Sequence, residues 1–491
     1  MPLVAKRRRI TRRWRTLQRV RASIELESSR QRTSVDASCS VFQTVLGFLA
    51  MSREIVPVTP PPIFELNIEQ VTCYTSARTC LRLYGSALPP LPPPTRRTGM
   101  IRAMGRVLGC IACVMAVSVA GCSGVSSTTP PAPTPLIGCS SAIARAGSLL
   151  KPLDVAAVSG YPFGVVAIPN NDRAIVSTTT VGRDGGGSLE TLQVRSGAVR
   201  LVSTVALIGT AQAYGIALSH DDRWLAVATG PDTLLVNVSK LLSGALNPVV
   251  ATLTDNSRGQ VEVAFSNDDR YVFVSDENSE AVSVFDISVA VASGFTSLPT
   301  AVGEVPLGAS PVGLAVSPDG RWLYVAGFDA SNGRGSLWVI DQQIASSNPH
   351  AAVVSHVAAG CSLVRVVLSP KGDTAWVTAQ LSNKLLAFDT AALRVRPEHS
   401  LQAAIQVGSE PTGLALYSDG RYAVVTNSAR FLEPGEAQTI MVVNLSAALQ
   451  HRPAIKAWIA AGAFPREAAV DGNLGLVTNY NSDTVEVFRL P

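Results

Sequence analysis

Seven copies of one strand-and-turn pattern fill the chain from about residue 150 to its end. Each copy has an alternating apolar run, a tight turn and a second alternating run, and the clearest copy is SPVGLAVSPDGRWLYVAG at residues 310–327. Equivalent positions recur about every 50 residues, at Gly164, Gly215, Glu262, Gly313, Arg365, Gly413 and Glu467. A period of this length, built from strands and turns, is the signature of β-propeller blades.

Each copy continues with two further apolar runs. In the third copy they are AVSVFDI at residues 281–287 and TAVGEVPLG at residues 300–308. Several of the third runs end in a residue with a short polar side chain that can cap a turn, namely Asn237, Asp286, Asp341, Asp389 and Asn444. Four strands in each of seven copies predict an all-β fold, a seven-bladed propeller over residues 149–491.

The last copy ends at Pro491 and lacks a fourth strand. A run with the fourth-strand pattern, LKPLDVAAVSGYP, lies at residues 150–162, before the first copy. We expect this N-terminal strand to pair with the C-terminal TVEVFRL, residues 484–490, and so to complete the last blade. Closure of this kind leaves no unpaired sheet edge.

Residues 1–99 have a different composition. They carry 16 Lys and Arg against 6 Asp and Glu, with proline clusters at residues 59–62 and 89–94, and we expect them to be disordered. One interpretation is a basic arm that binds nucleic acid or acidic lipid. The interpretation we favour is an upstream extension of the reading frame, with translation starting at Met100 or Met104.

Residues 100–121 have the parts of a secretory signal, which are a short basic region, about 13 apolar residues and small residues before Cys122. The apolar run is shorter than the roughly 20 residues that span a bilayer. The segment Val119–Cys122 resembles the lipobox of bacterial lipoproteins, which implies that Cys122 is lipidated and that residues 122–148 form a Ser/Thr/Pro-rich tether. Ser123 in place of Asp implies anchoring at the outer membrane of the cell envelope.

Two further cysteines, Cys139 and Cys361, follow the predicted lipidation site. An oxidising compartment favours a disulfide between them. Two separate thiols are an equal alternative, because no spacing argument brings these residues together.

The repeats resemble the YVTN family of seven-bladed propellers, most closely at residues 310–327. The resemblance covers about 340 residues and implies the fold. It does not imply one function, because such propellers include surface-layer proteins, nucleic-acid-binding periplasmic proteins and relatives described as lactonases.

Three of the seven equivalent positions are charged where the others are glycine, namely Glu262, Arg365 and Glu467. They are expected at one mouth of the propeller channel, where they could converge on a ligand together with Arg258, Arg466, Tyr161 and Tyr214. The alternative, which we prefer, is that the glutamates and arginine pair with one another and plug the axis.

Two classes of function remain. The chain has 5 His and no HExxH, GxSxG or phosphate-loop motif, so we expect neither a cofactor nor a metal. Residues 122–491 carry a formal charge of −7, which makes nucleic acid an unsuitable partner. We expect a monomeric binding module for a protein, glycan or small molecule. The alternative is a lactonase-like hydrolase, in which Glu262 or Glu467 acts as general base or metal ligand and Arg365 holds a substrate anion.

Overall fold

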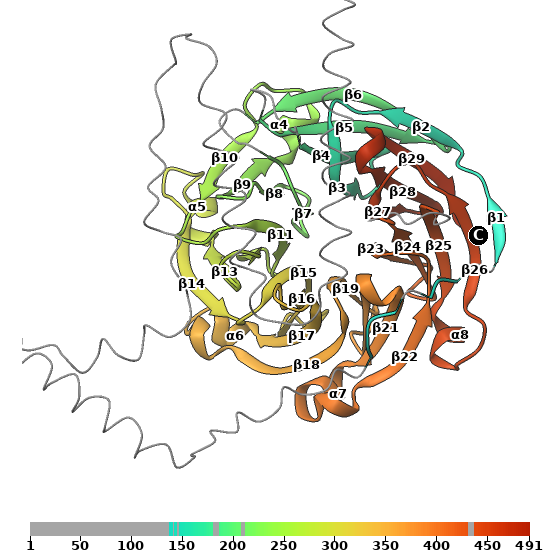
Figure 1. Ribbon diagram of the computed structural model, residues 1–491. Coiled ribbons are helices and arrows are strands. Elements are labelled where there is room, and N and C mark those ends of the chain that lie inside the picture. The colour runs from blue at the N-terminus through green and yellow to red at the C-terminus, as the bar shows by residue number, and fades with distance from the viewer. Residues whose placement is uncertain (1–136, 141, 145–146, 180–185, 208–211, 431–436) are drawn as a thin grey trace, which may run out of the picture. The chain divides into compact units, whose positions relative to one another are not determined.

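Seven antiparallel sheets surround a central axis as the blades of a propeller (Figure 1). The computed structural model describes residues 137–491 except 141, 145–146, 180–185, 208–211 and 431–436. The predicted all-β, seven-bladed fold is confirmed. The predicted extension (1–99), the signal peptide (100–121), Cys122 and the tether as far as residue 136 lie outside the described residues.

The first four blades are each made of strands consecutive in the chain, and the first strand of each is the innermost (Figure 1). They are β3 (Tyr161–Ile168), β4 (Arg173–Thr179), β5 (Ser188–Arg195) and β6 (Ala198–Ala206); β7 (Ile216–Leu218), β8 (Trp224–Ala228), β9 (Thr233–Asn237) and β10 (Val249–Leu253); β11 (Gln260–Phe265), β12 (Tyr271–Asp276), β13 (Ala281–Asp286) and β14 (Thr300–Pro306); and β15 (Ser310–Val316), β16 (Trp322–Phe328), β17 (Arg334–Asp341) and β18 (Val353–Cys361).

The last three blades follow the same order, but the sixth and seventh each take a strand from the N-terminal part of the chain. They are β19 (Leu363–Leu368), β20 (Thr374–Ala379), β21 (Lys384–Asp389) and β22 (Leu401–Gln406); β23 (Pro411–Tyr417), β24 (Tyr422–Asn427), β25 (Thr439–Asn444), β26 (Ile455–Ala460) and β1 (Ser148–Leu150); and β27 (Pro465–Asp471), β28 (Leu474–Asn479), β29 (Thr484–Arg489) and β2 (Asp154–Ala157).

Strand β2 closes the ring. It pairs antiparallel with β29, with Asp154 opposite Val487 and Ala157 opposite Thr484. The predicted exchange between the two ends of the chain is therefore confirmed. Strand β1, which the repeat pattern did not predict, pairs in parallel with β26 on the outside of the sixth blade and covers the free edge of that sheet.

Short helices follow the third strand in most blades. They are α4 (Val238–Leu242), α5 (Ser288–Ala292), α6 (Gln342–Ala345), α7 (Thr390–Val395) and α8 (Leu445–Leu449), with 3₁₀ turns η2 (Pro349–Ala351) and η4 (Pro397–His399). The polar residues expected to cap turns instead cap four of these helices, where Asn237, Asp341, Asp389 and Asn444 accept hydrogen bonds from backbone N–H groups. Two further 3₁₀ turns, η3 (Gln380–Ser382) and η5 (Tyr480–Ser482), follow second strands.

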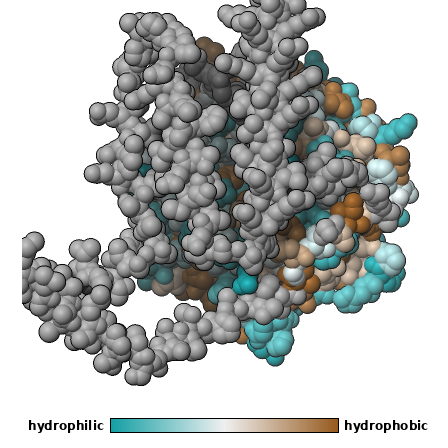
Figure 2. Space-filling model, in the orientation of Figure 1, coloured by the Kyte–Doolittle hydropathy of each residue, from teal (hydrophilic) through white to brown (hydrophobic). Residues whose placement is uncertain are grey.

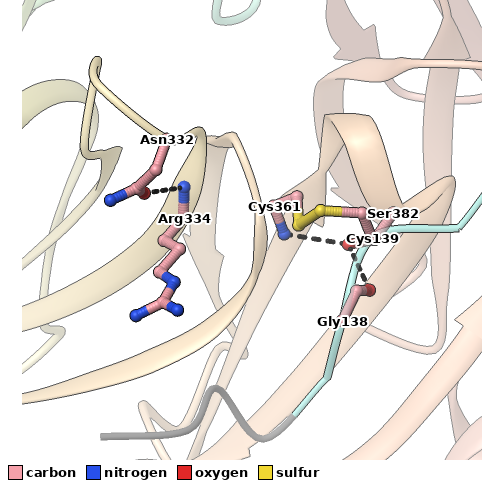
Figure 3. The surroundings of a disulfide bond; sticks show 6 residues. All are labelled: Gly138, Cys139, Asn332, Arg334, Cys361 and Ser382. Carbon is pink, nitrogen blue, oxygen red and sulfur yellow. Dashed lines mark hydrogen bonds between the residues drawn. A yellow bond between two sulfur atoms is a disulfide. The ribbon is translucent and has the colours of Figure 1, made fainter. Parts of the chain in front are cut away.

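Residues 137–140 and 142–144 form hydrogen bonds with the fourth and fifth blades. Cys139 is joined to Cys361 of β18 by a disulfide, and Gly138 O accepts a hydrogen bond from Ser382 Oγ (Figure 3). Further along, Ala144 N donates to Val407 O. The end of the segment expected to be a free tether is thus held against the propeller by backbone hydrogen bonds and a covalent bond.

The hydrophobic core lies between neighbouring blades, whose middle strands are buried on both faces. Strand β20 is buried along its whole length, and Trp376 and Phe388 are among the largest side chains with almost no exposed surface. Inner strands approach so closely that a Cβ on Gly313 would lie 2.9 Å from Arg365 Cα. This contact explains why glycine is frequent at the equivalent positions.

The outer rim carries both hydrophilic and hydrophobic patches where the described residues are visible (Figure 2). Within the described part of the chain, no helix combines the length and the apolar character that crossing a bilayer requires.

Candidate functional site

Three charged side chains from three innermost strands meet in the channel. Arg365 on β19 pairs with Glu262 on β11, with 2.8 Å between Nη2 and Oε1, and the same nitrogen pairs with Glu467 on β27. The three side chains are only 8% to 13% exposed. They form the mutually paired arrangement, which we call the axial triad.

In the axial triad, the pKa values of Arg365 and Glu467 depend on the charges of their neighbours. Burial opposes the charge of Arg365, but Glu262 and Glu467 outweigh this effect and raise the pKa of the guanidinium. Burial raises the pKa of Glu467 to about 6, although Arg365 acts in the opposite direction. The triad is therefore held together by pairing in a site where an isolated charge would be costly.

A pocket of ≈ 800 Å³ opens at the mouth where the second strands end. We call it the axial pocket. Its aromatic lining comes from Phe163, Tyr214, Phe464 and Tyr480, and its charged lining comes from Arg258, Arg430, Arg466, Asp255 and Glu277. The amides of Asn256, Gln260 and Asn278 also line it, whereas the axial triad does not.

Arg466 lies at the centre of the aromatic lining. Its guanidinium carbon is 3.5 Å from the ring centroid of Phe163, 5.7 Å from that of Phe464 and 5.9 Å from that of Tyr480. Burial, with Arg365 nearby, lowers the pKa of Arg466 to about 10. Among the described residues no carboxylate lies within ion-pairing distance of Arg466, so aromatic faces are its close partners.

The aromatic residues support one another. Tyr480 stacks on Tyr161 with 5.2 Å between centroids, and Phe163 meets Tyr214 edge to face at 5.0 Å. Phe464 packs against Tyr480 at 5.3 Å although its backbone has a φ of 56°, in the left-handed region that bulky residues avoid. Positive φ values recur just before the first strand of other blades, at Gly259, Ser362 and Glu410, so the aromatic wall is built on a feature of the repeat.

Two buried donors in the lining lack acceptors. Gln260 has no exposed surface, and its Oε1 accepts a hydrogen bond from Thr233 Oγ1 at 2.6 Å, but its Nε2 has no partner. Arg466 Nε is also buried without a partner. The lining also contains the carboxylate of Glu277. Burial raises its pKa, and the nearby Arg466 and Arg430 act in the opposite direction.

A hydrogen-bonded chain of four side chains adjoins the pocket at Ser257. Asp276 Oδ2 is 2.6 Å from Ser283 Oγ, Ser283 Oγ is 2.8 Å from Ser257 Oγ, and Ser257 Oγ is 2.9 Å from Glu304 Oε1. Three hydrogen bonds need three protons and the serines supply two, so one carboxyl proton completes the chain. Burial raises the pKa of Asp276 to about 8, so this carboxyl holds a proton at neutral pH.

The sequence-predicted residues fall into two groups. Glu262, Arg365 and Glu467 pair with one another, whereas Arg258, Arg466 and Tyr214 line the axial pocket. Tyr161 supports the pocket through its stacking on Tyr480.

Sequence reasoning missed the remaining lining residues. Phe163 directly precedes Gly164, the place that the predicted Tyr214 and Arg466 take in their own repeats. Glu277 and Tyr480 directly follow second strands, and Gly230 lies one residue further from the end of β8. Comparing these two columns across the repeats would have found Phe163, Glu277 and Tyr480, since the residues there differ from blade to blade.

The two carboxylates named for the hydrolase alternative, Glu262 and Glu467, do not line the axial pocket. Both carboxylates are paired with Arg365. Within residues 137–491, apart from the gaps given above, no group of three His, Cys, Asp or Glu is placed to hold a metal ion.

Comparisons with known proteins identify the fold. No family model matches the chain, and no curated protein sequence matches it. Among solved structures it is similar to hydrazine synthase of Kuenenia stuttgartiensis, with a TM-score of 0.51 and 16% identity over 67% of this chain and 96% of that one. It is also similar to a chain of the mitotic checkpoint complex, with a TM-score of 0.54 and 14% identity over 75% and 98% of the two chains.

Proposed function

We propose that this chain is a binding module of the bacterial cell envelope whose axial pocket receives a small polar ligand. The observation that carries the proposal is Arg466, a guanidinium that faces the pocket over Phe163 and has no carboxylate partner among the described residues. The axial triad forms no ion pair with Arg466, and Glu277, Glu262 and Glu467 attract it only at longer range, so no close carboxylate of a described residue competes with a ligand for this guanidinium.

The location is part of the same proposal. Cys122 follows a signal-like segment, and the repeats resemble the YVTN family, which is consistent with an exported propeller anchored through lipid at the outer membrane. The disulfide between Cys139 and Cys361 supports an oxidising compartment. In a bacterial host, a fatty-acid analogue should label the chain and not its Cys122→Ala variant; labelling that persists in this variant refutes the anchor.

Binding is tested by filling the pocket. Saturation-transfer NMR would screen the purified chain against sugars, amino acids, short peptides and organic acids. We expect at least one compound to receive signal from the wild type and not from Asn256→Trp, since Asn256 is an exposed lining residue.

The matched control is Asn348→Trp, which places the same bulk on an exposed residue beside η2. This variant should bind like the wild type. If no compound distinguishes the two tryptophan variants, the axial pocket is not the binding site.

A further inference from the structure

The lining of the axial pocket combines planar polar groups with aromatic rings. Its aliphatic side chains are few, Val261 and Pro231, so the pocket does not suit a lipid or another aliphatic ligand. Rings and planar polar groups together suit a molecule with a flat face and many hydrogen-bonding groups around its edge. A sugar ring has both properties.

One end of the pocket demands an anion. Arg466 lines the pocket and rests on Phe163, and no carboxylate of a described residue lies within ion-pairing distance of it. A guanidinium in such a partly desolvated place binds a planar carboxylate through two parallel hydrogen bonds, which are among the strongest that side chains make.

A second donor points to the same chemistry. Gln260 is fully buried, its Oε1 is already used by Thr233, and its Nε2 has no partner. Gln260 belongs to the lining, so a small opening of the wall would let this amide donate to a ligand oxygen and remove an unfavourable unpaired donor.

The other side of the pocket offers acceptors. Asp255 and Glu277 are carboxylates of the lining, and Asn256 and Asn278 present amides that accept and donate. Hydroxyl groups donate to such acceptors. Asp255 Oδ1 accepts from Ser257 N and Glu277 feels Arg466 and Arg430, but each carboxylate can accept further hydrogen bonds, so a ligand that also carries donors suits this side better than an anion alone.

We propose that the axial pocket binds an acidic sugar, a pyranose that carries a carboxylate. The carboxylate pairs with Arg466, ring hydroxyls bond to Asp255 and Glu277, and the C–H face of the ring lies against Tyr480 and Phe464. This inference rests on the proposed binding function and names the class of its ligand.

Calorimetry with two matched probes tests the inference. A tetrasaccharide of β-1,4-linked glucuronic acid and cellotetraose differ only in carboxylate against hydroxymethyl. We expect the acidic probe to bind the wild type about tenfold more tightly, equivalent to about 1.4 kcal/mol, and Arg466→Gln to remove the difference. Equal binding of the two probes by the wild type overturns the inference.

Two further variants change exposed residues, so their effects on binding do not depend on a loss of folding. Asn256→Asp adds a negative charge at an exposed lining residue and should weaken binding of the acidic probe severalfold. Arg270→Gln removes an arginine from the turn that begins β12, at the opposite mouth, and should change nothing.

A third probe separates this inference from the proposed function. Tetra-alanine carries a carboxylate and no sugar ring. If it binds through Arg466 while both sugars fail, or if none of the three probes binds, the acidic-sugar class is overturned. The binding function is then still judged by the two tryptophan variants in the NMR screen.

Discussion

Replacing Arg365 by methionine leaves Glu262 and Glu467 facing each other without their shared cation. The three side chains are 8% to 13% exposed, so water screens the two carboxylates poorly. Breaking a buried ion pair by removing one partner costs about 3 to 5 kcal/mol. We expect Arg365→Met to lower the free energy of unfolding by this amount at pH 8.

The loss should shrink in acid. The pKa of Glu467 is about 6 even with Arg365 present, and loss of the cation raises it further. A carboxyl whose pKa is raised on folding contributes stability that is fully present below its unfolded pKa of about 4.5 and is lost as pH rises through the folded pKa. The variant should therefore lie closer to the wild type at pH 5 than at pH 8.

Urea titration at pH 5, 7 and 8 measures both effects. The matched control is the triple variant Glu262→Gln/Arg365→Met/Glu467→Gln, which removes every charge of the axial triad and should recover most of the stability. A loss below about 1 kcal/mol for Arg365→Met, unchanged between pH 5 and pH 8, would show that the triad does not depend on its ion pairs.

Three further predictions concern other parts of the propeller. The pKa of Asp276 is about 8 in the folded protein and 3.8 ordinarily, so the free energy of unfolding of the wild type should fall between pH 5 and pH 9, by up to about 1.4 kcal/mol per pH unit. In urea titrations Asp276→Asn should flatten this slope, and parallel slopes for the two proteins would contradict the assignment of the proton to Asp276. Cys139 and Cys361 are 222 residues apart, so reducing their disulfide should lower the free energy of unfolding by up to about 5 kcal/mol. The double variant Cys139→Ser/Cys361→Ser is the control, because its stability should not respond to reductant. A chain that begins at residue 159 lacks the strand Asp154–Ala157 and exposes the edge of β29, whereas a chain that begins at residue 151 keeps that edge covered. The shorter chain should melt at a lower temperature and aggregate more. Equal melting temperatures and solubility would refute the role of this strand in closing the ring.

A register shift interrupts the first strand of six blades, at the level of the axial triad and the axial pocket. Alternation along a regular strand would place Arg466 and Glu467 on opposite faces. In the structure a register shift lies between Pro465 and Ala468, and similar shifts interrupt β11 and β19 near Glu262 and Arg365. Glu467 joins the axial triad and Arg466 faces the axial pocket, and the shift lies at this pair of residues.

The sequence alone determined the blade count, the order of strands within a blade and the closure by an N-terminal strand. These features follow from the period of the repeats and from the alternation of apolar residues, which are local properties of the chain. The tertiary structure decided which charges pair, which donors remain unpaired at Gln260 and Arg466, and how residues 137–140 and 142–144 bind to two blades. Those outcomes depend on residues about 100 or more positions apart and on bulges a few residues long, and no local pattern specifies either.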